Sequence, residues 1–198
     1  MIYLSRQAFT EKYAPAIANL CKGTGIYPQT LLAIAIVESQ AKAPNGNYYV
    51  GLSPLAAKYK NYFGIKKGIG WKGKTIALDT PNDTDPVSIF RVYNSFEDSA
   101  ADFIKFLKTN KRYEKAGVFK ATSYPEQIMR IAKAGYSESS SYTEVITAVA
   151  KKINGYIDKI IKPYKKTIQG GGPVVIALLI LTAFAVNKLR TTNKKAHE

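Results

Sequence analysis

The sequence predicts a mainly helical α+β fold with one small β-hairpin, followed by a C-terminal transmembrane helix. Three observations support this fold class. Apolar residues recur every three or four positions over most of residues 1–160, as on the buried face of a helix. Two strand-like runs flank a turn rich in Asp and Pro. Residues 167–187 carry no charge and lie between basic residues, which is typical of a helix that crosses a bilayer.

The chain has 198 residues, enough for one domain with a hydrophobic core plus appendages. We expect a domain at 1–162, a basic and Gly-rich linker at 163–172, a transmembrane helix at 173–189 and a basic tail at 190–198. The first four residues are too few and too weakly apolar for a signal peptide. These features predict a single-pass membrane protein that is anchored by its C-terminal end.

Positive charge is concentrated toward the C-terminal end. Residues 151–198 hold 10 Lys and Arg against 2 Asp and Glu, whereas residues 1–150 hold 19 against 12. This distribution indicates contact with a lipid bilayer, because anionic headgroups attract basic flanking segments. A solvated Lys-rich surface is the alternative. The sequence has no basic motif with base-reading or stacking residues, so we expect no nucleic-acid partner.

Cysteine and histidine are too scarce for several kinds of chemistry. Cys21 is the single cysteine, which excludes an internal disulfide and a cysteine-based metal cluster. His197 is the single histidine and lies in the tail, which argues against a zinc site or a His-dependent triad. We therefore expect no metal and no cofactor, and any acid–base chemistry must come from carboxylates, Tyr or Lys.

The first two helices are predicted at 6–22 and 28–39. The first has apolar residues at helical spacing, and Pro15 within it predicts a kink or a later start. The second begins at Pro28, which suits a first helical turn, and it contains an unbroken apolar run from 31 to 37. A buried strand is the competing interpretation of that run.

Glu38 follows the apolar run directly. At the C-terminal end of a buried helix its pKa is raised by partial desolvation and by the negative end of the helix dipole. A carboxyl that stays protonated near neutral pH can serve as a general acid. The alternative is that Glu38 only marks where the helix meets water, and spacing alone leaves both interpretations open.

The remaining elements follow from periodicity and turn signals. We expect a loop at 41–50, a helix at 53–60, strands at 75–78 and 87–93 joined by a turn, a helix from Ser95, a turn at 113–118, and helices at 125–134 and 143–162. In the helix at 125–134 the inward residues are expected to be Ile128, Met129 and Ala132. In the last helix Val145 is among the residues expected on the buried side.

Five short motifs occur in a fixed order. They are GTGI at 23–26 leading to LAIAIVES at 32–39, GLSPLA at 51–56 followed by NYFGIK at 61–66, FRVYNS at 90–95, RY at 112–113, and AGY at 134–136 followed by Tyr142. In these motifs the first 160 residues resemble the bacterial glucosaminidase domain, glycoside hydrolase family 73. The resemblance does not extend to the C-terminal segment.

The resemblance implies a lysozyme-like α lobe, a small β-hairpin lobe and a cleft between them. It also implies hydrolysis of the β-1,4 bond after N-acetylglucosamine in peptidoglycan. Glu38 matches the catalytic acid of the family, and Tyr136 matches a tyrosine implicated in the cleft, which we expect to be a catalytic residue. The positions expected to contact or shape the substrate site are Asn61, Phe63, Tyr93 and Tyr142, although scaffold roles are the alternative for Asn61, Phe63 and Tyr136.

Two departures from the family pattern affect the site. Eleven residues, 40–50, lie between Ser39 and the motif at 51–56, where the family usually continues with GWG, and the hairpin lacks the glutamate that the family often carries there. A second catalytic carboxylate must then be an aspartate of the hairpin turn, and Asp83 and Asp79 are the candidates.

The expected mechanism begins with Glu38 protonating the glycosidic oxygen. Water then attacks, activated by a hairpin aspartate or assisted by the acetamido group of the substrate. A lytic transglycosylase or muramidase on the same fold is one alternative, and a non-catalytic wall-binding module is another. The expected partners are peptidoglycan strands, a lipid bilayer and proteins of a phage virion or bacterial envelope, in whose membrane we expect the chain.

Overall fold

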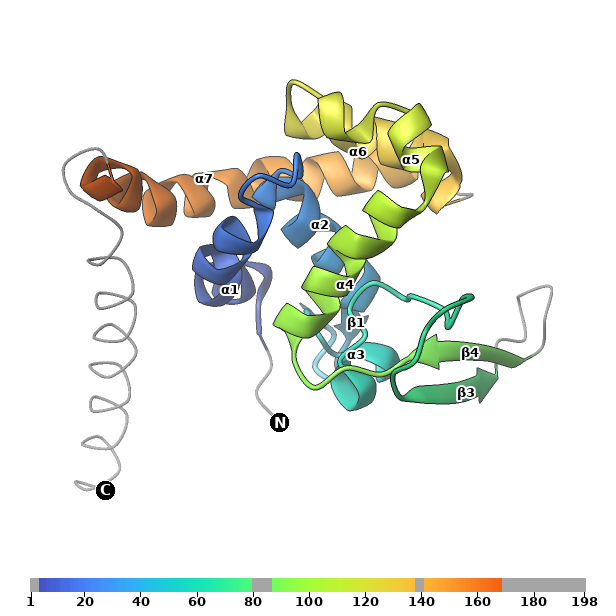
Figure 1. Ribbon diagram of the computed structural model, residues 1–198. Helices are drawn as coiled ribbons and strands as arrows, with labels where there is room; N and C mark the ends of the chain where they lie inside the picture. The colour runs from blue at the N-terminus through green and yellow to red at the C-terminus, as the bar shows by residue number, and fades with distance from the viewer. Residues whose placement is uncertain (1–3, 80–86, 138–140, 169–198) are drawn as a thin grey trace. The chain divides into compact units, whose positions relative to one another are not determined.

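The computed structural model describes residues 4–79, 87–137 and 141–168, with side-chain surroundings as far as residue 160 (Figure 1). Its elements are α1 (Arg6–Cys21), α2 (Pro28–Ser39), β1 (Ala41–Lys42), β2 (Tyr48–Tyr49), α3 (Pro54–Tyr59), β3 (Thr75–Asp79), β4 (Val87–Arg91), α4 (Phe96–Thr109), α5 (Lys111–Lys115), the 3₁₀ turn η1 (Val118–Lys120), α6 (Tyr124–Ile131), the π turn η2 (Ala132–Tyr136) and α7 (Tyr142–Ile168). This order confirms a mainly helical α+β class. The chain divides into two units, Met1–Asp158 and Lys159–Glu198, and the boundary falls within α7.

Helix α2 forms the centre of the first unit, and it packs against α1 and α6. Residues 31–36 are completely buried, so the apolar run is a helix enclosed on all sides and not a strand. Pro28 occupies the first turn, where its missing N–H has no intrahelical partner to lose. The helix ends at Ser39, since Gln40 is extended, and this places Glu38 in the last turn.

Helix α1 runs unbroken through Pro15, so the later start expected from that proline is wrong. Ser5 caps the helix by accepting a hydrogen bond from the Ala8 N–H, and Phe9 and Ile17 are buried on its inner face. The Phe9 ring lies edge-on to Phe96 at 4.9 Å, which joins α1 to the first turn of α4. The two helices therefore share one aromatic cluster.

The segment 41–50, predicted as a loop, contains a two-residue antiparallel ladder. Ala41 pairs with Tyr49 and Lys42 with Tyr48, while Gly46 turns the chain with φ of 84°. Strands of two residues are too short to produce an alternating pattern, which is why the sequence did not reveal them. The segment between α2 and the 51–56 motif is thus a short hairpin.

Two further predictions are wrong in their details. The segment 113–118 is mostly helical, because α5 continues to Lys115 before Gly117 turns with φ of 71°. In α6 Met129 is exposed and the polar Gln127 is completely buried. The Gln127 amide donates to the carbonyls of Gly25 and Val118 and accepts from the Tyr27 N–H, so a polar side chain fills this core position.

Strands β3 and β4 form the predicted antiparallel hairpin, with Thr75 opposite Arg91 and Asp79 opposite Val87. Residues 80–86 of the predicted turn lie outside the described part of the chain. An isolated bridge between Lys66 and Phe90 attaches the segment after α3 to β4. The hairpin is therefore held to the 61–66 motif.

Helix α7 begins at Tyr142 and extends to Ile168. Its buried stripe includes Ile146, Ile153 and Ile157, whereas Val145 is 43% exposed, contrary to expectation. Within the described ranges, no helix has a stretch long and apolar enough to cross a membrane. The transmembrane helix predicted at 173–189 and the tail at 190–198 lie outside those ranges.

Candidate active site

A hollow of about 780 Å³ opens beside the C-terminal end of α2. Its walls come from the segment that follows α3, from β4, from the ends of α4 and α5, and from η2. Segments from many parts of the sequence therefore contribute to one cavity. Its size suits part of a chain-like or drug-sized ligand.

Glu38 lies on the wall of this hollow and reaches solvent there. Among the described lining residues it is the only carboxylate. Protein on its remaining sides desolvates the carboxyl, and this burial raises its pKa, while the neighbouring Tyr142 hydroxyl lowers the pKa by a smaller amount. The balance favours the protonated acid at a higher pH than for a free glutamate, as a general acid requires.

Tyr136 and Tyr142 stand beside Glu38, with their rings 5.9 Å apart. The Tyr136 hydroxyl donates a 2.9 Å hydrogen bond to the Phe63 carbonyl, which joins η2 to the opposite wall. The Tyr142 hydroxyl is buried, and no described residue makes a hydrogen bond to it with standard distance and angles. It is still close enough to the Glu38 carboxyl for the two groups to shift each other's pKa. Burial and the nearby Glu38 carboxylate raise the pKa of both phenols, so both are neutral.

Phe63 forms the floor of the hollow and is only 3% exposed. Its ring stacks on Phe103 at 4.3 Å with an interplanar angle of 5°. Tyr136 meets the same Phe103 ring edge-on at 5.4 Å. Phe63 thus shapes the cavity through core packing, and its carbonyl positions Tyr136.

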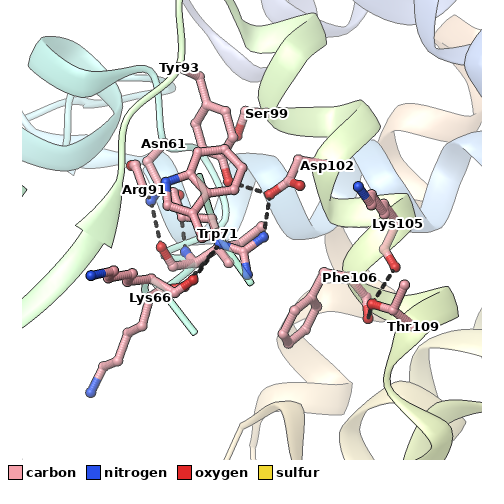
Figure 2. A network of polar contacts seen from close by, with 12 residues as sticks. Asn61, Lys66, Trp71, Arg91, Tyr93, Ser99, Asp102, Lys105, Phe106 and Thr109 are labelled. Carbon is pink, nitrogen blue, oxygen red and sulfur yellow. Dashed lines mark hydrogen bonds and ion pairs between the residues drawn. The ribbon is translucent and has the colours of Figure 1, made fainter. Parts of the chain in front are cut away.

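Asn61 does not line the hollow, because its side chain is 1% exposed and bonded to backbone (Figure 2). Its amide nitrogen donates to the carbonyls of Ile65 and Arg91, at 2.9 and 3.0 Å. Its amide oxygen accepts from the Ile65 N–H at 3.0 Å. Asn61 therefore closes the 61–65 turn and fastens it to β4, which is a positioning role and not substrate contact.

Tyr93 also lies behind the hollow, within the network drawn in Figure 2. Its hydroxyl donates to Asp102 at 2.7 Å, and the Arg91 guanidinium donates to the same carboxylate oxygen at 2.7 Å. Arg91 also donates to the carbonyls of Lys66 and Lys67, and its guanidinium carbon lies 4.8 Å from the centre of a Trp71 ring. Asp102 and Arg91 thus fix the segment 66–71 against β4.

Of the two candidates for the second catalytic carboxylate, Asp79 and Asp83, the structure describes only Asp79. Asp79 is exposed at the end of β3 and does not line the hollow. Asp83 lies outside the described residues. Within the described part of the chain no group of three His, Cys, Asp or Glu residues could hold a metal ion.

Most of the described lining residues are not among the site residues that the sequence indicates, and three of them carry side chains that could contact a ligand. Phe106 on α4 offers a half-buried aromatic ring, and Ile69 is fully exposed at the rim between two glycines. Arg112 on α5 supplies a guanidinium. The motif at 112–113 was a signal for Arg112, whereas Phe106 and Ile69 have no local sequence signature.

Solved structures with the same fold include glycoside hydrolase domains. The glycoside hydrolase domain of FlgJ from Salmonella typhimurium is 22% identical, with a TM-score of 0.58, and the match covers 85% of this chain and 100% of that one. A peptidoglycan hydrolase from Sphingomonas sp. A1 is 26% identical, with a TM-score of 0.55 and coverage of 73% and 86%. The fold is therefore one that glycoside hydrolase domains share, and Glu38 is the one carboxylate among the described residues that line its hollow.

The family follows from the sequence profile of the glucosaminidases, described as mannosyl-glycoprotein endo-beta-N-acetylglucosaminidase, which matches residues 14–155. The chain belongs to this family. The peptidoglycan hydrolase FlgJ of Vibrio parahaemolyticus is 30% identical over 117 residues, covering 57% of this chain and 36% of that protein. A probable N-acetylmuramidase of Lactococcus lactis subsp. cremoris is 32% identical over 139 residues, covering 62% and 28%. The chain spans about a third of the length of these relatives.

Proposed function

We propose that this protein hydrolyses the β-1,4 glycosidic bond after N-acetylglucosamine in peptidoglycan, with Glu38 as the general acid. The observation that carries the proposal is the position of Glu38. Its carboxyl faces the hollow, is the only carboxylate among the described lining residues, and has a raised pKa. The names of the relatives support peptidoglycan as the substrate.

In this mechanism Glu38 gives its proton to the glycosidic oxygen as the bond to the sugar breaks through an oxocarbenium-like state. The ionised Glu38 that remains can accept a hydrogen bond from the Tyr142 hydroxyl. This hydroxyl has no other hydrogen-bond partner among the described residues. Tyr142 therefore stabilises the product form of the acid.

The group that assists water is the second part of the proposal. Asp79 does not line the hollow, so the candidates are Asp83 and the acetamido group of the substrate itself. An Asp83→Asn variant distinguishes them. Loss of activity assigns the base to Asp83, whereas retained activity assigns the role to the acetamido group.

The test of the function is digestion of purified peptidoglycan by the full chain, followed by reduction and mass analysis of the products. We expect reducing N-acetylglucosamine ends from the wild type and none from Glu38→Gln. Glu11→Gln is the matched control, because Glu11 is exposed on α1 and does not line the hollow. Equal digestion by wild type and Glu38→Gln would refute the proposed role of Glu38.

A muramidase is the second candidate, favoured by the name of the Lactococcus relative, and a lytic transglycosylase is the related alternative. Both activities also need one acid in the hollow. Muramic acid at the new reducing ends would assign the muramidase, and anhydro-muramic acid would assign the transglycosylase. Either product would retain Glu38 as the acid and change the bond.

We further propose that residues 173–189 anchor the chain in the membrane of a phage virion or bacterial envelope, where virion or envelope proteins are its neighbours. The support is the uncharged segment 167–187 with Lys165, Lys166, Lys188 and Arg190 around it. Fractionation without detergent tests this proposal. The full chain should sediment with membranes, and a chain that stays in the supernatant would refute the anchor.

A further inference from the structure

The described lining of the hollow has an excess of positive charge. The lining includes three cationic residues, Lys66, Arg91 and Arg112, and one carboxylate, Glu38. The general acid must be protonated before it acts, and in that state the described lining carries cations alone. A neutral sugar chain does not require such a lining, so the charge points to an anionic group on the ligand.

Arg91 is not available for that anion. Asp102 accepts from its guanidinium at 2.7 Å, and two backbone carbonyls accept from its Nε. An arginine that already has a carboxylate partner and several backbone partners acts mainly as a structural clamp.

Arg112 is in a different situation. Its Nη2 donates to the Tyr113 hydroxyl at 2.7 Å, and its guanidinium carbon lies 4.8 Å from the centre of the Tyr113 ring. No carboxylate of the described residues pairs with it. None of the described hydrogen bonds or ion pairs joins Arg112 to Glu38 either.

The surroundings of Arg112 hold the guanidinium in place. Tyr113 is completely buried, so its hydroxyl is a fixed acceptor. Gly135 lies on another side, where an added Cβ would come within 3.4 Å of Arg112 Nη1. Arg112 is exposed, and apart from the bond to Tyr113 its donors have no partner among the described residues, so its guanidinium can bind a carboxylate through two parallel hydrogen bonds.

We propose that Arg112 is a specificity residue that binds a carboxylate of the substrate. The inference rests on the proposed function, since peptidoglycan carries carboxylates beside its sugar chain. Two sources share this chemistry: the carboxylates of an attached stem peptide, and the lactyl carboxylate of a muramic acid from which the peptide has been removed. A carboxylate bound in the hollow also disfavours ionisation of Glu38, which keeps the acid protonated.

The test measures binding of soluble glycan fragments to the full chain by calorimetry, in the inactive Glu38→Gln background. Four fragments are used: with stem peptides, without them, and each again with its carboxylates converted to methyl esters. We expect Arg112→Gln to weaken binding of a carboxylate fragment roughly 10-fold, as for loss of a charge-assisted hydrogen bond, and to have no such effect on its ester. Lys111→Gln is the matched control, because Lys111 is an exposed neighbouring cation outside the lining.

The pattern across fragments identifies the source. A loss confined to fragments with stem peptides assigns the peptide carboxylate, and a loss with stripped fragments assigns the lactyl carboxylate. Equal losses on acids and esters, or no loss on either, would overturn the proposal. Arg112→Lys, which keeps the charge, should recover part of the affinity if charge is what matters.

A second measurement does not depend on how well the Arg112 variants fold. Affinity of the Glu38→Gln protein for the acid fragments should fall as salt is raised, while affinity for the esters should not. The same salt dependence for both would also overturn the carboxylate assignment. If the wild type digests no peptidoglycan and Glu38→Gln binds no fragment, the proposed function fails and the assignment fails with it. If the wild type digests peptidoglycan but Arg112→Gln does not change the binding of any fragment, the assignment of Arg112 is refuted and the proposed function stands.

Discussion

Replacement of Asn61 by Ala should destabilise the protein strongly, although Asn61 does not face the hollow. The change removes three hydrogen bonds, two donated to the carbonyls of Ile65 and Arg91 and one accepted from the Ile65 N–H. The side chain is 1% exposed, so water cannot easily replace these bonds. At about 1 kcal/mol each, the loss is about 3 kcal/mol of unfolding free energy.

Urea unfolding followed by circular dichroism measures this effect. With a slope of about 2 kcal/mol per M, the midpoint should fall by about 1.5 M. Asn45→Ala is the matched control, because Asn45 also makes side-chain hydrogen bonds but is exposed. We expect the control to change stability by less than about 1 kcal/mol. If Asn61→Ala unfolds within that same margin of wild type, the argument from buried hydrogen bonds is wrong.

Three further predictions concern the site. Tyr142→Phe removes the group that lowers the pKa of Glu38, so the alkaline limb of the kcat/KM profile should move to higher pH; an unmoved or lower limb would contradict this. Glu38→Gln should raise Tm relative to wild type, and by more at pH 7 than at pH 4. The pKa of Glu38 is higher in the folded than in the unfolded protein, so wild-type stability falls as the pH rises through the folded-state pKa. An equal difference in Tm at both pH values would contradict this. Gly135→Ala should cost about 1 kcal/mol in urea unfolding because Gly135 has φ of 82°, and an unchanged midpoint would contradict this.

The sequence predicted the parts of the fold that depend on local patterns. The apolar run from 31 to 37 identified α2 as a buried helix, and its last turn located Glu38. The same reasoning found the β3–β4 hairpin and most of α4, since each of these has a clear period or turn signal. Resemblance to a family then drew attention to Tyr136, which lines the hollow.

The parts that were not predicted depend on partners distant in sequence. Gln127 is buried because the Gly25 and Val118 carbonyls need a donor, and no local pattern shows that need. The sequence leaves open whether Asn61 contacts substrate or serves the scaffold, and in the structure its amide is occupied by the Ile65 and Arg91 backbone. A single sequence records which groups can form hydrogen bonds but not which of them have already done so.

The hydrogen bond from Tyr136 to the Phe63 carbonyl also limits what Tyr136 can offer a ligand. A phenol has one proton, and here that proton points away from any incoming molecule. The oxygen keeps its lone pairs, so in this arrangement Tyr136 receives hydrogen bonds and gives none to the ligand. A ligand group that meets it must bring its own hydrogen, as an amide N–H or a sugar hydroxyl does. A carbonyl or carboxylate oxygen at the same point would encounter electrostatic repulsion. Tyr136 thus accepts hydrogen bonds from a ligand, whereas Arg112 only donates them.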